Sequence, residues 1–146
     1  MEKIASFQKD HDKLQPGLYA QTDKNLITTF DLRFKKPNAG DYITPKALHT
    51  IEHLLATVLR NSEKKDDIVY FGPMGCRTGF YLLTLRLSFN EALTLLKESI
   101  KTALTLEEVP GSKREECGNY LEHDLAAAKE ELTNYLLILD GVEAHS

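Results

Sequence analysis

Two stretches of alternating side chains constrain the fold of this chain more than any other feature. In residues 26–34, every second position belongs to a set that is mostly apolar, namely Leu26, Thr28, Phe30, Leu32 and Phe34. Residues 79–88 alternate in the same way, with one side formed by Tyr81, Leu83, Leu85 and Leu87. In a β-strand, every second side chain lies on the same face, so a repeat of two residues indicates a strand. Both stretches are predicted to be strands, and the short apolar run at 68–71 predicts a third.

Helical periods predict three helices, at about residues 45–60, 90–106 and 125–139. Thr44 supplies a hydroxyl N-cap for the first helix, and Pro45 suits its first position. Ser88 and Glu91 match a capping box at the start of the second helix. Asp124 is the expected N-cap of the last one.

The order of these elements favours an α+β fold, in which helices pack on a mostly antiparallel sheet, over a doubly wound parallel sheet. With 146 residues, the chain has the length of one ordinary domain, and residues 1–146 are predicted to form it. A hydrophobic fraction of 42% and a charged fraction of 27% are close to the averages of globular proteins, which argues against disorder.

Charge and composition exclude several partners. The net charge is −4 and no long basic run occurs, so nucleic acid is not expected as a partner. No apolar stretch reaches the length of about 20 residues that a membrane span needs. The N-terminus lacks the apolar block of a signal peptide, and two cysteines are too few for a disulfide framework. We therefore expect a cytoplasmic protein.

The strongest chemical signal is a pair of histidines, His49 and His53, on the first predicted helix. Residues four apart share a helix face, so the two imidazoles can bind one metal ion. Glu52 lies beside them and can carry protons for metal-assisted chemistry. Together they match H-x-x-E-H, the pattern of one group of metallopeptidases, so a small metallohydrolase is one interpretation. Another interpretation is that both histidines simply face solvent and have no function in metal binding.

The two cysteines complete two different sites in this interpretation. Catalytic ions usually have three protein ligands and an open position, and Cys117 is the best-placed third ligand, although it could instead be a small buried side chain. Cys76 follows a glycine-rich loop between two strands, where a side chain is exposed at a sheet end. Next to Arg77 and an ion, it would serve as a proton carrier or nucleophile. Alternatively, Cys76 is the fourth ligand of a closed, non-catalytic Cys2His2 module.

These residues resemble the S-ribosylhomocysteine lyases, or LuxS proteins, along essentially the whole chain. Five ordered blocks carry the resemblance: Ser6-Phe7 with Asp10-His11, Phe30 to Phe34 with Pro37-Asn38, His49-Thr50 with Glu52-His53-Leu54, Pro73 to Tyr81, and Cys117-Gly118. The resemblance implies an α+β fold and a homodimer with active sites at the subunit interface. It also implies one ferrous ion per subunit, which zinc or cobalt can replace.

The resemblance further implies a role for each matching residue. Metal ligands would be His49, His53 and Cys117; an acid/base pair would be Cys76 and Glu52; and the substrate pocket, partly across the interface, would contain Ser6, His11 and Arg33. The implied reaction cleaves S-ribosylhomocysteine to homocysteine and 4,5-dihydroxy-2,3-pentanedione, the autoinducer precursor of quorum sensing. It proceeds by migration of a carbonyl group and β-elimination.

Overall fold

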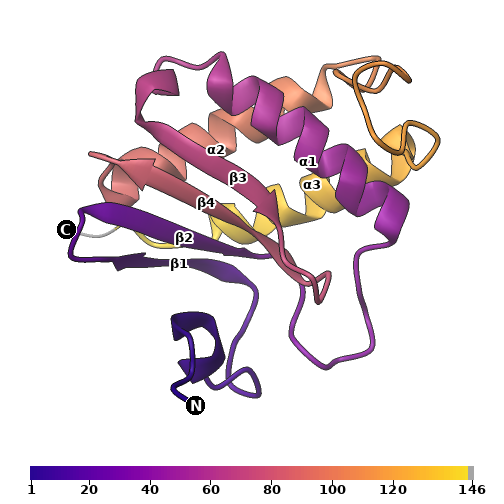
Figure 1. Ribbon diagram of the computed structural model, residues 1–146. Coiled ribbons are helices and arrows are strands. Elements are labelled where there is room, and N and C mark those ends of the chain that lie inside the picture. Colours follow the sequence, from indigo (N-terminus) through magenta and orange to yellow (C-terminus); the bar gives the residue numbers. More distant parts are fainter. Residues whose placement is uncertain (145–146) are drawn as a thin grey trace.

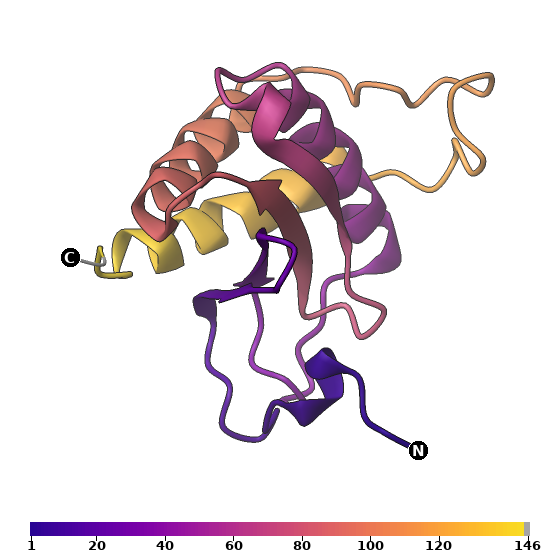
Figure 2. The same ribbon diagram turned by 60° about the vertical axis from the view of Figure 1, so that its left-hand side comes forward.

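A four-stranded antiparallel sheet with three helices on one face forms the fold (Figures 1 and 2). The computed structural model describes residues 1–144, apart from the side chains of Ala5 and Ser6. The predicted pocket side chain of Ser6 therefore lies outside the described residues. The α+β class predicted from the sequence is confirmed.

The sheet has the strand order β1-β2-β4-β3, and every neighbouring pair is antiparallel. Its strands are β1 (Gly17–Thr22), β2 (Ile27–Arg33), β3 (Ile68–Pro73) and β4 (Gly79–Leu85). The three strands predicted from the sequence are present. β1 was not predicted, because it is an edge strand in which only Gly17 and Leu18 are buried and the side chains show no alternation.

All three predicted helices are present, as α1 (Pro45–Arg60), α2 (Phe89–Leu104) and α3 (Leu125–Asp140). Their N-terminal caps form as expected. The Thr44 hydroxyl accepts from the backbone of Ala47, the Ser88 and Glu91 capping box closes in both directions, and Asp124 accepts from the backbone of Ala127. Two short 3-10 turns, η1 (Ala5–Gln8) and η2 (Lys65–Asp67), complete the elements.

The core lies between the helices and one face of the sheet. On that face, β2 pairs Phe30 with Leu82 and Leu32 with Phe80 of β4, and all four side chains are fully buried. The helices contribute an apolar stripe each, including Ile51, Leu54, Leu55, Leu96, Ile100, Leu132 and Leu139. The burial of these apolar side chains holds the sheet and the helices together.

None of the described α-helices covers the opposite face of the sheet. Here Tyr81, Leu83 and Leu85 of β4 are half-buried, and Tyr19 and Tyr70 of the flanking strands are exposed. β4 thus presents apolar side chains on both of its faces. The N-terminal segment lies on this side and is joined to β2 through an ion pair between Lys9 and Asp31 (Figure 2).

One long connection positions the candidate metal site. Residues 105–124, between α2 and α3, contain no helix or strand and lie beside α1 (Figure 1). Two carbonyl groups of this connection, those of Pro110 and Glu122, accept hydrogen bonds from histidines of α1. Within the described part of the chain, none of the helices combines the length and the apolar character that a membrane crossing requires.

Candidate active site

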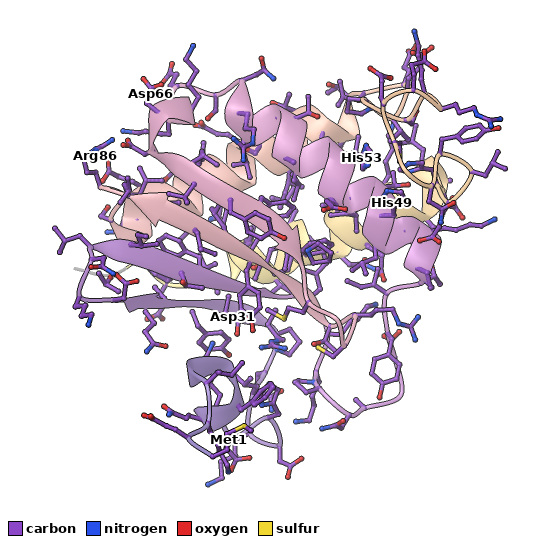
Figure 3. The ribbon with its side chains drawn as sticks, viewed as in Figure 1. Met1, Asp31, His49, His53, Asp66 and Arg86 are labelled. Carbon is purple, nitrogen blue, oxygen red and sulfur yellow. The ribbon has the colours of Figure 1, made fainter. Side chains whose placement is uncertain are left out.

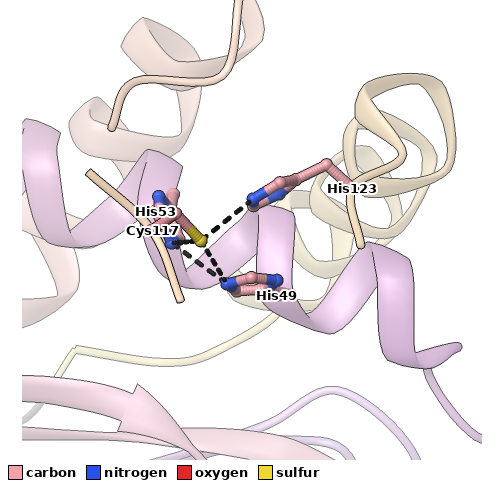
Figure 4. Close-up of side chains that lie close together, drawn as sticks. All are labelled: His49, His53, Cys117 and His123. Carbon is pink, nitrogen blue, oxygen red and sulfur yellow. Dashed lines mark hydrogen bonds between the residues drawn. The ribbon is translucent and has the colours of Figure 1, made fainter. Parts of the chain in front are cut away.

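Four side chains converge beside α1 to form a cluster that can hold a metal ion. His49 and His53 come from α1, Cys117 from the 105–124 connection, and His123 from the residue before the N-cap of α3. Their potential ligand atoms all lie within 4.8 Å of one another. Figure 4 shows the two α1 imidazoles and the His123 ring turned toward the Cys117 sulfur.

Backbone carbonyls fix which nitrogen of each α1 histidine faces the cluster. His49 Nδ1 lies 2.8 Å from the Glu122 carbonyl, and His53 Nδ1 lies 2.9 Å from the Pro110 carbonyl. A carbonyl only accepts, so each Nδ1 must donate and each Nε2 of a neutral ring carries a lone pair. The two Nε2 atoms are 3.1 Å apart. Two facing lone pairs repel each other in the absence of a cation. A cation between them binds both nitrogens and removes this repulsion.

The distances to the sulfur fit the same ion. Cys117 Sγ lies 3.5 Å from His49 Nε2 and 3.8 Å from His53 Nε2. A tetrahedral ion with metal–nitrogen bonds of about 2.0 Å and a metal–sulfur bond of about 2.3 Å separates such atoms by roughly 3.3 to 3.6 Å. The three predicted ligands are therefore brought together with a spacing that suits a divalent ion, and the hydrogen bonds of both imidazoles leave Nε2 free to bind it.

His123 was not among the predicted site residues. Its ring stacks on His49 with centroids 4.1 Å apart, and its Nδ1 lies 3.0 Å from the Thr50 hydroxyl. Burial lowers the pKa of His123, and the neighbouring His49 and His53 lower it further, against the opposing effect of Glu122. The one signal in the sequence was its position, six residues after Cys117 and directly before the Asp124 cap. Cys76, the alternative fourth ligand, does not belong to this cluster.

Cys76 is exposed on the loop between β3 and β4, where it belongs to a separate network. Its Sγ lies 3.1 Å from the Thr78 hydroxyl, and this hydroxyl accepts a hydrogen bond of 2.8 Å from Arg33 Nη1. The cation linked to the thiol is thus Arg33. The adjacent Arg77, expected from the sequence to act on the thiol, donates a hydrogen bond to the Ile43 carbonyl.

Arg33 is almost fully buried and holds this network to the sheet. Its Nη2 donates to Asp31 Oδ2 over 2.7 Å, and Lys9 Nζ donates to the same oxygen over 2.8 Å. Among the described residues, Arg33 Nε and Asp31 Oδ1 have no hydrogen-bond partner. The predicted pocket residue His11 lies in the segment that Lys9 joins to Asp31, and its Nδ1 is 3.0 Å from the Lys9 carbonyl oxygen.

Gly79 brings the Cys76 loop close to Arg33. It pairs directly with Arg33 in the β2–β4 register, and a Cβ at this position would collide with the backbone oxygen of Leu32. No side chain can be accommodated there, because the obstacle is backbone. The glycine therefore allows β4 to begin against β2, with Thr78 within reach of the buried guanidinium.

The metal cluster and the thiol network lie apart in the protomer. Figure 3 shows Asp31 well separated from His49 and His53. No hydrogen bond or ion pair joins the two groups among the described residues. Glu52 is half-buried on α1, one residue before His53. A hollow with a volume of about 830 Å³ lies between α1 and α2, and none of the predicted site residues lines it.

Fold and cluster together describe a small α+β protein with a group of three imidazoles and one cysteine that can hold a metal ion. Comparison with known proteins identifies the protein family. A family model described as S-Ribosylhomocysteinase (LuxS) matches residues 4–143. The chain belongs to this family.

Curated relatives agree over nearly their full lengths. An S-ribosylhomocysteine lyase of Borreliella afzelii is 46% identical, with 98% of this chain and 96% of that protein covered. Proteins of the same name from Desulfotalea psychrophila and Porphyromonas gingivalis are each 45% identical. Coverage is 97% of this chain and 94% of the relative in the first case, and 93% and 90% in the second. Family membership replaces the metallopeptidase interpretation of the H-x-x-E-H pattern.

Proposed function

We propose that this protein cleaves S-ribosylhomocysteine to homocysteine and 4,5-dihydroxy-2,3-pentanedione, the autoinducer precursor of quorum sensing. The observation that carries the proposal is the His49–His53–Cys117 cluster in a chain of this family, with two Nε2 lone pairs directed at one point. The same cluster supports one divalent ion per subunit. We propose a ferrous ion, which zinc or cobalt can replace.

His49, His53 and Cys117 would hold the ion and leave one position open for substrate. When bound, the ion supplies Lewis acidity, which favours the negative charge that develops on a carbonyl oxygen as the neighbouring carbon loses a proton. The Glu122 and Pro110 carbonyls keep both imidazoles in the ligating tautomer throughout the reaction.

Cys76 is the proposed carrier of protons to and from the carbon chain. The hydrogen bonds around Cys76 suit this role. The Thr78 hydroxyl accepts a hydrogen bond from Arg33 and can donate its own hydrogen to the Cys76 sulfur. A thiolate formed at Cys76 is thereby solvated by a buried, positively charged hydrogen-bond chain. Glu52, on the same helix as the ligands, is the proposed carrier of protons on the substrate oxygens.

We propose a homodimer whose active sites form across the interface. Each protomer holds its metal cluster and its thiol network in separate places, so one chain alone does not bring an ion to Cys76. The face of the sheet opposite α1, α2 and α3 offers the contact surface, since Tyr81, Leu83 and Leu85 are only half-buried there and none of the described α-helices covers them. In the proposed symmetric pair, the thiol network of each protomer would face the partner's metal cluster.

Ser6, His11 and Arg33 are the proposed substrate-pocket residues. Support comes from the N-terminal segment, which Lys9 joins to Asp31 beside Arg33. The pocket would then lie on the thiol side of the shared site. Two free cysteines suit a reducing compartment, and we propose the cytoplasm as the place of action.

The direct test is release of homocysteine from S-ribosylhomocysteine by protein purified without oxygen, followed with a thiol reagent and accompanied by metal analysis. The proposal requires turnover that disappears on chelation and returns with Fe²⁺ or Co²⁺. The matched control is Cys76→Ala, which is expected to keep its ion and release no thiol. Metal-loaded protein that leaves the substrate intact would refute the proposal.

A further inference from the structure

We propose that His123 is a positioning residue that donates a hydrogen bond from Nε2 to the Cys117 thiolate and thereby sets the charge which that thiolate passes to the ion. This inference rests on the metal site of the proposed function. Its basis is the direction of each hydrogen bond around Thr50, His123 and Cys117, together with the stacking of His123 on His49.

The Thr50 hydroxyl decides which nitrogen of His123 carries a hydrogen. Thr50 is fully buried, and its Oγ1 accepts the backbone N–H of Asp124 over 2.9 Å. A hydroxyl has one hydrogen to give, and among the described residues His123 Nδ1, at 3.0 Å, is the partner placed to receive it. A buried hydroxyl hydrogen without an acceptor would be costly. Nδ1 of His123 therefore accepts, and the ring hydrogen is on Nε2.

This tautomer directs an N–H group at the sulfur. His123 Nε2 lies 3.8 Å from Cys117 Sγ, within reach of a hydrogen bond to sulfur. The other two ring nitrogens near Sγ belong to His49 and His53, whose Nδ1 hydrogens are already given to carbonyl groups. Those two nitrogens offer lone pairs to the ion and no hydrogen to the sulfur. Figure 4 draws all three imidazoles around the sulfur, and of these only His123 has a ring hydrogen left to donate to the thiolate.

The ring geometry separates this role from that of a fourth ligand. His49 and His53 are inclined by 79°, so lone pairs in their ring planes can meet at one point. His49 and His123 are inclined by only 25° at a centroid distance of 4.1 Å. Lone pairs in two nearly parallel, stacked rings do not converge on one ion close to both. The stack holds the His123 ring in place, and its edge serves the sulfur.

A donor on the thiolate has a defined effect on the ion. The hydrogen bond draws electron density from sulfur, so the ion receives less charge from its ligand and remains a stronger Lewis acid. Loss of a partner in this outer position typically lowers metal affinity or activity by about 10- to 100-fold. The chain Asp124 N–H to Thr50, Thr50 to His123 and His123 to Cys117 thus connects the start of α3 with the metal site.

The test uses cobalt, because the thiolate-to-Co²⁺ charge-transfer band in the near ultraviolet reports the electron density on sulfur directly. His123→Phe keeps an aromatic ring on His49 and removes the N–H. His123→Gln keeps an N–H donor near the position of Nε2. We expect one Co²⁺ per subunit in both variants, a band displaced to longer wavelength in the Phe variant, and a return toward the wild-type position in the Gln variant. Turnover should fall about 10- to 100-fold in the Phe variant.

Three outcomes overturn parts of this account in different ways. An unchanged band in His123→Phe would refute the hydrogen bond. A Phe variant that gains a solvent ligand, seen as a new oxygen neighbour in X-ray absorption, would make His123 a metal ligand and refute the positioning role. Wild-type protein that binds no Co²⁺ and shows no band would instead refute the metal site of the proposed function.

Discussion

Replacement of Thr78 by valine tests the network behind the proposed catalytic thiol. Thr78 is 1% exposed, and its hydroxyl accepts from Arg33 Nη1 over 2.8 Å. Valine has nearly the same shape, so the substitution opens no cavity, yet it leaves a buried guanidinium N–H without an acceptor. Hydrogen bonds to charged groups contribute about 1.5–3 kcal/mol, so the free energy of unfolding should fall by that amount.

Urea unfolding of the metal-free protein measures this effect, since a slope of about 1–3 kcal/mol per molar urea converts the loss into a midpoint lower by roughly 1 M. Thr78→Ser retains the hydroxyl and serves as the matched control. Alkylation of Cys76 by iodoacetamide at neutral pH, located by mass spectrometry, should also be slower in the valine variant than in the serine variant. Equal midpoints and equal labelling rates in the two variants would show that the hydroxyl bridges nothing.

Three further predictions concern the metal side. His49→Ala, His53→Ala and Cys117→Ala should each be purified without the ion, as measured by elemental analysis, because two remaining ligands hold a catalytic ion poorly; full occupancy would remove that residue from the ligand set. Glu52→Gln should keep its metal while turnover falls by about two to four orders of magnitude, and a near-normal rate would assign Glu52 an orienting role. In the metal-free protein, burial and then His49 and His53 lower the pKa of His123 below 6.5, so the unfolded chain binds the proton more readily. The stability that neutral His123 contributes is therefore present above about pH 6.5 and is lost as the pH falls through its lowered pKa. The urea midpoint should be lower at pH 5 than at pH 8, and this drop should be smaller in His123→Gln than in the wild type.

Local patterns explain why most of the fold could be predicted from the sequence. The period of residues 26–34 and the caps at Thr44 and Ser88 depend on neighbours in the chain, and the structure contains the predicted strand and helices. β1 (Gly17–Thr22) shows no such pattern, because most of its side chains are exposed. Its place at the sheet edge depends on pairing with β2, which no local period encodes.

The site was predictable only where its chemistry lies on one helix. His49 and His53 are four residues apart, and that spacing brings them to one face. His123 joins them because the 105–124 connection returns to α1, which is a long-range property of the fold. The link from Cys76 through Thr78 to Arg33 likewise depends on the register that sets Arg33 opposite Gly79. The neighbouring Arg77 was the natural expectation from chain order alone.

In the proposed dimer, an ion held by one protomer acts with the thiol of its partner. Mixed dimers of Cys76→Ala and His53→Ala subunits, selected with two different affinity tags, test it directly. Each variant alone should be inactive. In the mixed dimer, the intact cluster of the Cys76→Ala subunit meets the intact thiol of the other, so one of two sites is complete and about half of the wild-type rate per dimer should return. A mixed dimer as inactive as its parents would contradict the account and place the ion and the thiol within a single protomer.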